Sequence, residues 1–185
     1  MDLVAPAAPY LASYVAACEQ GWANERAALD PAAAAGELAE IHAGPEAFLA
    51  ALNHPTRLDQ PVVLPDGTTV PRLPGVRRWM WDGDYCGAIS LRWQPGSTEL
   101  PPYCLGHVGY AVVPWKRRRG YATDALAQML PIARDHGLAG IDIVTDITNT
   151  ASASVVQACG GVLVREYVVP EESGGFTAHQ WRIAL

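Results

Sequence analysis

The stretch on which the fold of this chain depends is Val112-Val113-Pro114-Trp115-Lys116-Arg117-Arg118-Arg119-Gly120-Tyr121-Ala122-Thr123. It joins an apolar run, residues 108–113, to an amphipathic run, residues 122–136. This order predicts a strand that leads into a helix through a basic turn containing a glycine. Such a turn collects unpaired backbone N–H groups at the positive end of the helix dipole, which carries roughly half a charge. Phosphate binding is the chemistry that suits this geometry.

Small residues and arginines of this turn fit the same purpose. Gly120 has no side chain, so the backbone can approach an anion closely, and the small Ala122 has a similar effect one step into the helix. The three arginines, residues 117–119, can add charge-assisted hydrogen bonds at the rim. The alternative is a surface turn with a solvated basic run. The position of the motif after a strand and at a helix start favours the functional interpretation.

In these residues the chain resembles the GNAT superfamily of N-acetyltransferases. Arg117-x-x-Gly120-x-Ala122 is similar to the pyrophosphate-binding loop of that superfamily, and residues 109–114 resemble the strand before it. Residues 146–152 resemble the end of the next strand and the start of the helix that follows. The resemblance runs from about Arg78 to about Val168. It is strongest to uncharacterised bacterial members with a Gly-His-(Ile/Val)-Gly-Tyr strand, here residues 106–110.

The resemblance implies acetyl-CoA as cosubstrate, held between the central strand and the next one. Its pyrophosphate would lie on residues 117–122, and its pantetheine arm would pair with the strand end as an added strand does. Asn149 has two interpretations, a helix N-cap or a hydrogen bond to the cofactor, with Ser152 nearby. The cofactor contacts expected on this basis are Val112, Val113, Arg117, Arg118, Arg119, Gly120, Tyr121, Ala122, Thr123, Asn149 and Ser152.

Transfer to an amine needs a group that removes a proton, because a lysine-like amine with a pKa of ~10.4 is almost wholly protonated at pH 7. His107 on the central strand is our candidate base, since its ordinary pKa lies near ~6.5. The alternative is a hydrogen-bonded strand histidine. Asp146, Glu99 and Asp84 are further candidates, and a capping or turn role is the more natural one for Asp146.

The chain departs from the superfamily pattern at the position of the usual acid. Many members carry a tyrosine four residues before the glycine that ends the later helix, and here that position is Val156. Tyr110, Tyr121 or Tyr167 could substitute, and their spacing does not select one. A thiol leaving group with a cysteine-like pKa near ~8.5 departs as a fairly stable anion, so the acid contributes less.

Composition narrows the class of protein. The chain has 185 residues, half of them hydrophobic, and a formal net charge of −6, which argues against a nucleic-acid partner. No apolar stretch approaches the ~18–20 residues needed to cross a membrane, and the first residues do not resemble a signal peptide. The four cysteines are far apart without a CxxC pair, so we expect reduced thiols in the cytoplasm and no metal site.

The periodic segments predict an α/β fold with a mixed, mostly antiparallel central sheet flanked by helices, in one domain over residues 1–185. We expect residues 1–75 to be the more variable part, which shapes the acceptor side, and residues 76–185 to bind acetyl-CoA. We expect residues 61–75 to form an irregular lobe or a small hairpin. We expect residues 105–113 to form the central strand.

The sequence and the resemblance together predict an N-acetyltransferase that moves an acetyl group from acetyl-CoA directly to a primary amine. The acceptor would be a small molecule or a peptide, and homodimerisation stays open. The alternative is a non-catalytic acyl-CoA-binding or sensing module on the same scaffold, which would bind acetyl-CoA without turnover.

Overall fold

The structure is a computed structural model that describes residues 1–24, 27–54, 61–64, 66–171 and 175–185. Its contacts divide the chain into two compact units, each built from several segments. The first unit comprises Met1–Pro55, Val76–Ser90 and Tyr110–Ala125, and the second comprises Thr56–Gly75, Leu91–Gly109 and Leu126–Leu185. The expected division into residues 1–75 and 76–185 stays a prediction.

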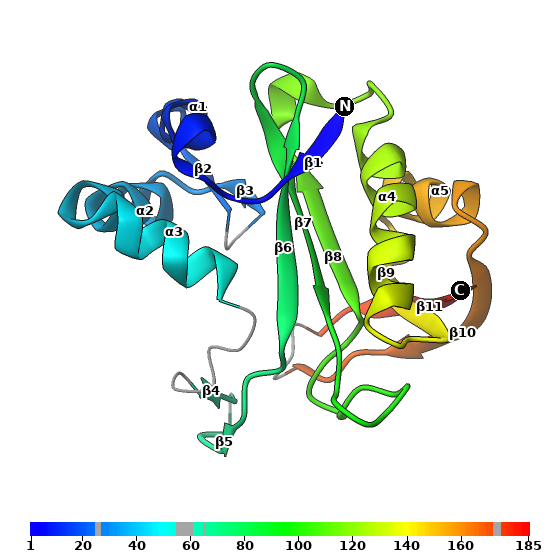
Figure 1. The fold of residues 1–185 in the computed structure, drawn as a ribbon. Helices are drawn as coiled ribbons and strands as arrows, with labels where there is room; N and C mark the ends of the chain where they lie inside the picture. Colours follow the sequence, from blue (N-terminus) through cyan, green and yellow to red (C-terminus); the bar gives the residue numbers. More distant parts are fainter. Residues whose placement is uncertain (25–26, 55–60, 65, 172–174) are drawn as a thin grey trace. The chain divides into compact units, whose positions relative to one another are not determined.

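Three helices and most of a four-stranded sheet form the first unit. The strands are β1 (Asp2–Val4), β6 (Gly75–Trp81), β7 (Tyr85–Arg92) and β8 (Val108–Val112), in the order β1-β6-β7-β8. The helices are α1 (Ala8–Glu19), α2 (Pro31–Ala43) and α3 (Pro45–Asn53), which lie together on one side of β6 (Figure 1). Helix α2 begins at Pro31, because Asp30 accepts a hydrogen bond from the Ala33 N–H at 3.0 Å and caps the helix there.

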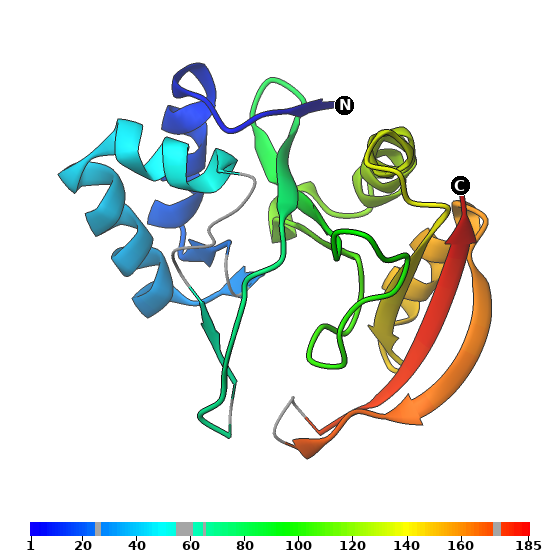
Figure 2. The same cartoon turned by 60° about the horizontal axis from the view of Figure 1, so that its bottom comes forward.

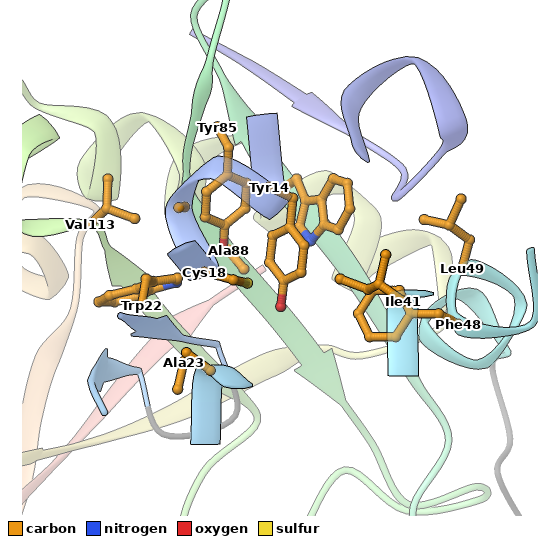
Figure 3. Packing of buried hydrophobic residues seen from close by; sticks show 13 residues of the cluster. Tyr14, Cys18, Trp22, Ala23, Ile41, Phe48, Leu49, Tyr85, Ala88 and Val113 are labelled. Carbon is orange, nitrogen blue, oxygen red and sulfur yellow. The ribbon is translucent and has the colours of Figure 1, made fainter. Parts of the chain in front are cut away.

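Aromatic side chains fill the core of this unit. Tyr14 of α1 stacks on Trp79 of β6 with ring centroids 4.7 Å apart, and its edge meets Tyr85 of β7 at 5.0 Å. Figure 3 shows Tyr14 in the middle of the cluster, between Trp22 and Phe48. Aromatic pairs of this kind contribute about 0.5–1.5 kcal/mol each beyond the area that they bury. The cluster therefore fixes α1 on the face of β6 and β7.

The second unit is built on a three-stranded antiparallel sheet in the order β10-β11-β9. Its strands are β9 (Gly140–Asp146), β10 (Val162–Val168) and β11 (Thr177–Ala184), and α5 (Thr150–Ala158) lies beside β9 (Figure 2). On β9 and β11 one face of the sheet is apolar and buried, whereas β10 is mostly exposed. On the buried face the indole N–H of Trp181 donates to the Thr145 hydroxyl at 3.0 Å. The other face carries the polar side chains of Asp142, Gln180 and Arg182.

The smaller elements connect these parts of the chain. Two short hairpins pair β2 (Trp22–Ala23) with β3 (Ala28–Leu29), and β4 (Val62–Val63) with β5 (Thr69–Val70). The second confirms the hairpin predicted within residues 61–75. A 3-10 turn, η1 (Pro114–Lys116), separates β8 from α4 (Tyr121–Asp135), which crosses from the first unit into the second.

The α/β class and the antiparallel character of the sheet are confirmed. Among the described residues the longer strands form two hydrogen-bonded sheets, beside the two short hairpins. Strand β8, predicted as the central strand, is the last strand of its sheet and begins at Val108 instead of residue 105. Immediately before β8, His107 turns its backbone N–H to the Asp142 carbonyl at 2.7 Å while its carbonyl accepts from the Arg92 N–H at 2.8 Å. Residue 107 thus hydrogen-bonds to β7 on one side and to β9 on the other.

Candidate functional site

The basic turn between β8 and α4 has an open, glycine-dependent backbone. Arg118 and Gly120 adopt φ angles of +62° and +80°, in the left-handed region that glycine tolerates and other residues rarely occupy. No heavy atom lies within 4 Å of the position that a Cβ on Gly120 would take. Arg117, which precedes Arg118 and Gly120, is extended, with φ −66° and ψ 165°. The first turn of α4 follows directly at Tyr121.

A carboxylate braces this turn from the β6–β7 loop. Asp82 accepts hydrogen bonds from the Lys116 ammonium at 2.8 Å and from the Tyr121 hydroxyl at 2.5 Å. Although partial burial alone would raise it, these two donors hold the pKa of Asp82 well below its usual value. The bond to Asp82 raises the pKa of Lys116. Tyr121, one of the predicted cofactor contacts, thus uses its hydroxyl to shape the turn, together with Lys116.

The arginines of the turn differ in what they contact. The Arg117 side chain folds back and donates from Nε to the Val112 carbonyl at 3.0 Å. Arg119 lies 4.0 Å from Asp82, with half of its side chain exposed. Arg118 makes no ion pair with any other residue that the structure describes. Arg118 therefore keeps its charge available to a ligand.

At its end, β8 is hydrogen-bonded to β7 along one edge, and its other edge has no neighbouring strand in the part of its sheet that the structure describes. Val113 is fully buried and donates its N–H to the Cys86 carbonyl of β7 at 2.9 Å. Gly87 makes this approach feasible, since a Cβ there would lie 2.1 Å from the Ala111 carbonyl. Because strand amides alternate in direction, the Val112 N–H faces the other edge, where β8 is the last strand of its sheet. Of the two predicted pantetheine contacts, Val112 is the better placed.

At the corner between β9 and α5, side chains of the corner itself accept the backbone N–H groups. Asn149 accepts the Ser152 N–H at 3.0 Å, so the N-cap interpretation of Asn149 is confirmed. Asp146 accepts from the Thr148 N–H at 2.7 Å and from its hydroxyl at 2.6 Å, which lowers the pKa of Asp146. Asp146 is the turn residue that its position predicted, and a lowered pKa does not suit a base at neutral pH.

His107 lies in the second unit, clamped to β9. Its ring Nδ1 accepts the Asp142 N–H at 2.9 Å, and only 1% of the residue is exposed. Burial lowers the pKa of His107, and the nearby charges of Arg182 and Arg92 act in the same direction, against the opposing charge of Asp142. The alternative of a hydrogen-bonded strand histidine is therefore observed. The predicted base role stays a prediction, and it now competes with this structural role.

Asp142 is the charged residue of this neighbourhood that the sequence did not reveal. It accepts two hydrogen bonds from Arg182, both 2.7 Å long, and one from Gln180 at 3.1 Å. Although burial alone would raise it, the contacts with Arg182 keep the pKa of Asp142 below its usual value. Residues 142 and 182 lie 40 positions apart and show no motif, so only the register of β9 and β11 brings them together.

The predicted site residues fall in both units. Residues 112, 113 and 117–123 belong to the first, and His107, Asn149 and Ser152 belong to the second. Among the described residues, no group of three or more His, Cys, Asp or Glu side chains could hold a metal ion. Within the same part of the chain, no helix is long and apolar enough to cross a membrane.

Sequence comparison assigns a family to this arrangement. The family described as the acetyltransferase (GNAT) domain matches residues 29–162. The chain belongs to the GNAT acetyltransferase family. Acyl transfer is the chemistry of that family, so this GNAT protein is an acyltransferase. No curated protein matches the chain.

Solved structures similar to this GNAT protein support the fold. One is the microcin C7 self-immunity acetyltransferase MccE, solved with acetyl-CoA and AMP. It is 13% identical with a TM-score of 0.62, over 99% of this chain and 91% of that one. Another, from Bordetella pertussis, is described as a GNAT-family acetyltransferase and is 13% identical with a TM-score of 0.55, over 98% and 94% of the two chains. At these identities the likeness shows the fold alone.

The position of the missing acid lies in the core of this GNAT protein. Val156 of α5 is fully buried. Of the three tyrosines considered as substitutes, Tyr121 donates a hydrogen bond from its hydroxyl to Asp82, and that bond raises the pKa of Tyr121. Tyr167 lies under the Arg165 guanidinium, 4.6 Å from the ring centre. Neither contact identifies Tyr121 or Tyr167 as the acid that protonates the departing thiolate.

Proposed function

We propose that this GNAT protein transfers an acetyl group from acetyl-CoA to a primary amine of a small molecule or a peptide. The observation that carries the proposal is the turn at Gly120, where a left-handed backbone and open space meet the first turn of α4. That geometry fits a pyrophosphate, which would lie against the N–H groups of residues 120–123. Arg118 would add its charge at the rim, with Arg117 and Arg119 beside it.

The pantetheine arm would lie along the outer edge of β8. Its amides would pair with the backbone at Val112, in the manner of an added strand. Val113 would contribute packing from within the core, since its own N–H is bonded to β7. At the other corner, the side-chain oxygen of Asn149 serves the cap, so a cofactor hydrogen bond would come from its amide nitrogen, with the Ser152 hydroxyl nearby.

Direct transfer is supported by the state of two cysteines. Burial raises the pKa of both Cys18 and Cys86 to about 12. Since the thiolate is the nucleophile, neither is activated for a covalent acyl-enzyme at neutral pH. The amine would then attack the thioester itself, within a complex that holds both substrates.

The test is the release of free thiol from acetyl-CoA in the presence of a panel of amines. These should include polyamines, amino acid amides and N-terminal peptides. A transferase releases CoA only when a suitable amine is present, in equal amount to the acetylated product. Binding of acetyl-CoA without turnover on any amine would favour the second candidate, an acyl-CoA sensor. The observation that supports a sensor is the buried Val156 at the usual position of the acid, because a valine cannot donate a proton.

A further inference from the structure

One carboxylate of the β6–β7 loop contacts both ends of the basic turn. Lys116 ends η1, before the turn, and its ammonium donates to Asp82 Oδ1 at 2.8 Å. Tyr121 begins α4, after the turn, and its hydroxyl donates to Asp82 Oδ2 at 2.5 Å. The carboxylate of Asp82 therefore spans residues 117–120, which lead the chain into the proposed pyrophosphate site. All of these residues belong to the first compact unit.

Asp82 is itself held in a fixed position. Its side chain is only 17% exposed. Its Oδ1 also accepts the Asp84 N–H at 3.2 Å, and its own N–H donates to the Asp84 carbonyl at 3.2 Å. These bonds close the loop between β6 and β7, two strands that are hydrogen-bonded to each other. The carboxylate is thus a firm point to which the turn can be attached.

The segment that Asp82 spans contains an unfavourable backbone conformation. Arg118 has a φ angle of +62°, and Gly120 has one of +80°. Glycine adopts the left-handed region freely, whereas any other residue populates it about 5–30-fold less than a right-handed conformation. Such a conformation persists only where the surrounding structure holds it. Contacts at both ends of the segment can hold Arg118 in this way.

The charge of Asp82 opposes its effect on the shape of the turn. A carboxylate repels a pyrophosphate, and the carboxylate of Asp82 also neutralises the Lys116 ammonium. If only this charge mattered, removing it would strengthen the binding of an anion. If the contacts with Lys116 and Tyr121 order the turn, removing them would weaken the binding. The two effects have opposite signs, so a measurement can tell which is larger.

We propose that Asp82 is a positioning residue for acetyl-CoA, which holds residues 117–120 in the conformation that binds the pyrophosphate. The inference rests on the proposed function. In this role Asp82 acts through Lys116 and Tyr121 and does not itself contact the cofactor. A binding conformation that is only partly populated lowers the apparent affinity by its population. Holding the turn in that conformation therefore raises affinity without adding a contact to the ligand.

Two variants of the β6–β7 loop test the sign of the effect in titration calorimetry with acetyl-CoA. Asp82→Ala should bind about 5–30-fold more weakly, because residue 118 can then leave the left-handed region. Asp84→Ala is the matched control, since its carboxylate lies 3.4 Å from the same ammonium and its side chain is 69% exposed. It removes an equal charge and should change the affinity by less than about threefold. Unchanged or tighter binding in Asp82→Ala would overturn the proposal.

Substitutions at residue 118 test how Asp82 acts. Arg118→Ala and Arg118→Gly both remove the guanidinium charge, and only the glycine adopts the left-handed region freely. In the Arg118→Ala protein, adding Asp82→Ala should weaken acetyl-CoA about 5–30-fold. In the Arg118→Gly protein the same change should cost less than about threefold. A residue that only stabilises the fold would give equal losses in the two proteins, and that result would contradict the proposal.

The wild-type protein separates this inference from the proposed function. If it fails to bind acetyl-CoA, the proposed function is wrong and the inference falls with it. If it binds acetyl-CoA and Asp82→Ala binds equally well, only the role of Asp82 is wrong. Should Asp82→Ala not fold, Tyr121→Phe releases one end of the turn alone. It should then weaken acetyl-CoA more in the Arg118→Ala protein than in the Arg118→Gly protein, and equal effects would overturn the proposal.

Discussion

Two corners of this protein lead from a strand into a helix, and they differ in whether a side chain accepts the N–H groups at the start of the helix. At the corner before α5, Asp146 and Asn149 accept the N–H groups of Thr148 and Ser152. At the corner before α4, the residue preceding the helix is Gly120, which has no side chain to accept anything. There the carboxylate of Asp82 binds Lys116 and Tyr121 through their side chains.

The difference separates a structural helix start from one suited to a ligand. A side chain that caps the first turn satisfies the donors that an anion would otherwise bind. A glycine with open space around it leaves those donors to a ligand, and basic residues supply the charge. The α5 corner should therefore respond to substitution mainly in stability, and the α4 corner mainly in cofactor binding.

The largest effect on stability should come from Val156→Tyr in α5. Val156 is fully buried, so the larger ring overpacks the core and should lower the free energy of unfolding by about 1–3 kcal/mol. Urea denaturation measures this loss. We expect no gain in turnover, because the thiolate leaves without help from an acid. A tenfold higher kcat with unchanged acetyl-CoA affinity would show that an acid is limiting.

Substitutions of Asn149 can distinguish its role as a helix N-cap from a contact with the cofactor. Asn149→Ala should cost about 0.5–2 kcal/mol in the free energy of unfolding, because the Ser152 N–H loses its acceptor. Asn149→Asp is the matched control, since aspartate caps equally well. If the amide nitrogen binds the cofactor, both variants weaken acetyl-CoA in titration calorimetry, and only the alanine variant is less stable. Unchanged affinity in Asn149→Asp would confine Asn149 to its cap.

The dependence of stability on acidic pH should differ between the two corners, because Asp82 and Asp146 have different partners. A carboxyl group whose pKa is lowered by folding stabilises the protein above its unfolded pKa, near ~3.9 for aspartate, and that contribution is lost as the pH falls towards the folded value. Melting temperatures between ~pH 6 and ~pH 2 should fall less steeply in Asp82→Asn than in the wild type. Asp146→Asn should flatten the curve less, because Asp146 binds neutral Thr148 whereas Asp82 binds a lysine. Equal slopes in all three proteins would contradict this assignment.

The smallest effect should come from Arg118→Ala. An exposed rim charge contributes about 1 kcal/mol or less, so acetyl-CoA should bind less than tenfold more weakly. Titration calorimetry at two salt concentrations checks this, because the arginine contribution should shrink as salt rises. A loss of a hundredfold or more would move the main anion contact from the backbone to this side chain.

Local signals accounted for much of this fold. Gly120 and the apolar spacing after it predicted the start of α4, and the side chain of Asn149 predicted the cap of α5. These features depend on residues three or four positions apart, which a sequence shows directly. The hairpin of β2 and β3 was missed because two-residue strands have no periodicity.

The polar networks could not be predicted in the same way. No sequence motif singled out Asp82, yet it bonds to Lys116 across 34 positions. His107 was chosen as a base from its residue type and ordinary pKa. Its contact with Asp142, 35 positions away, determines which ring nitrogen carries the proton. Such roles follow from strand register, which the sequence does not state.

The most direct test of the α4 corner as the cofactor site is thermal stabilisation by acetyl-CoA in Gly120→Glu. The matched control is Gly137→Glu, because Gly137 at the other end of α4 has a φ of +81° against +80° for Gly120, and both positions are open. At 100 times its Kd, acetyl-CoA should stabilise the wild type and Gly137→Glu by about 2.7 kcal/mol. It should leave Gly120→Glu unshifted, since the new carboxylate fills the anion position. An undiminished shift in folded Gly120→Glu would show that the pyrophosphate binds elsewhere.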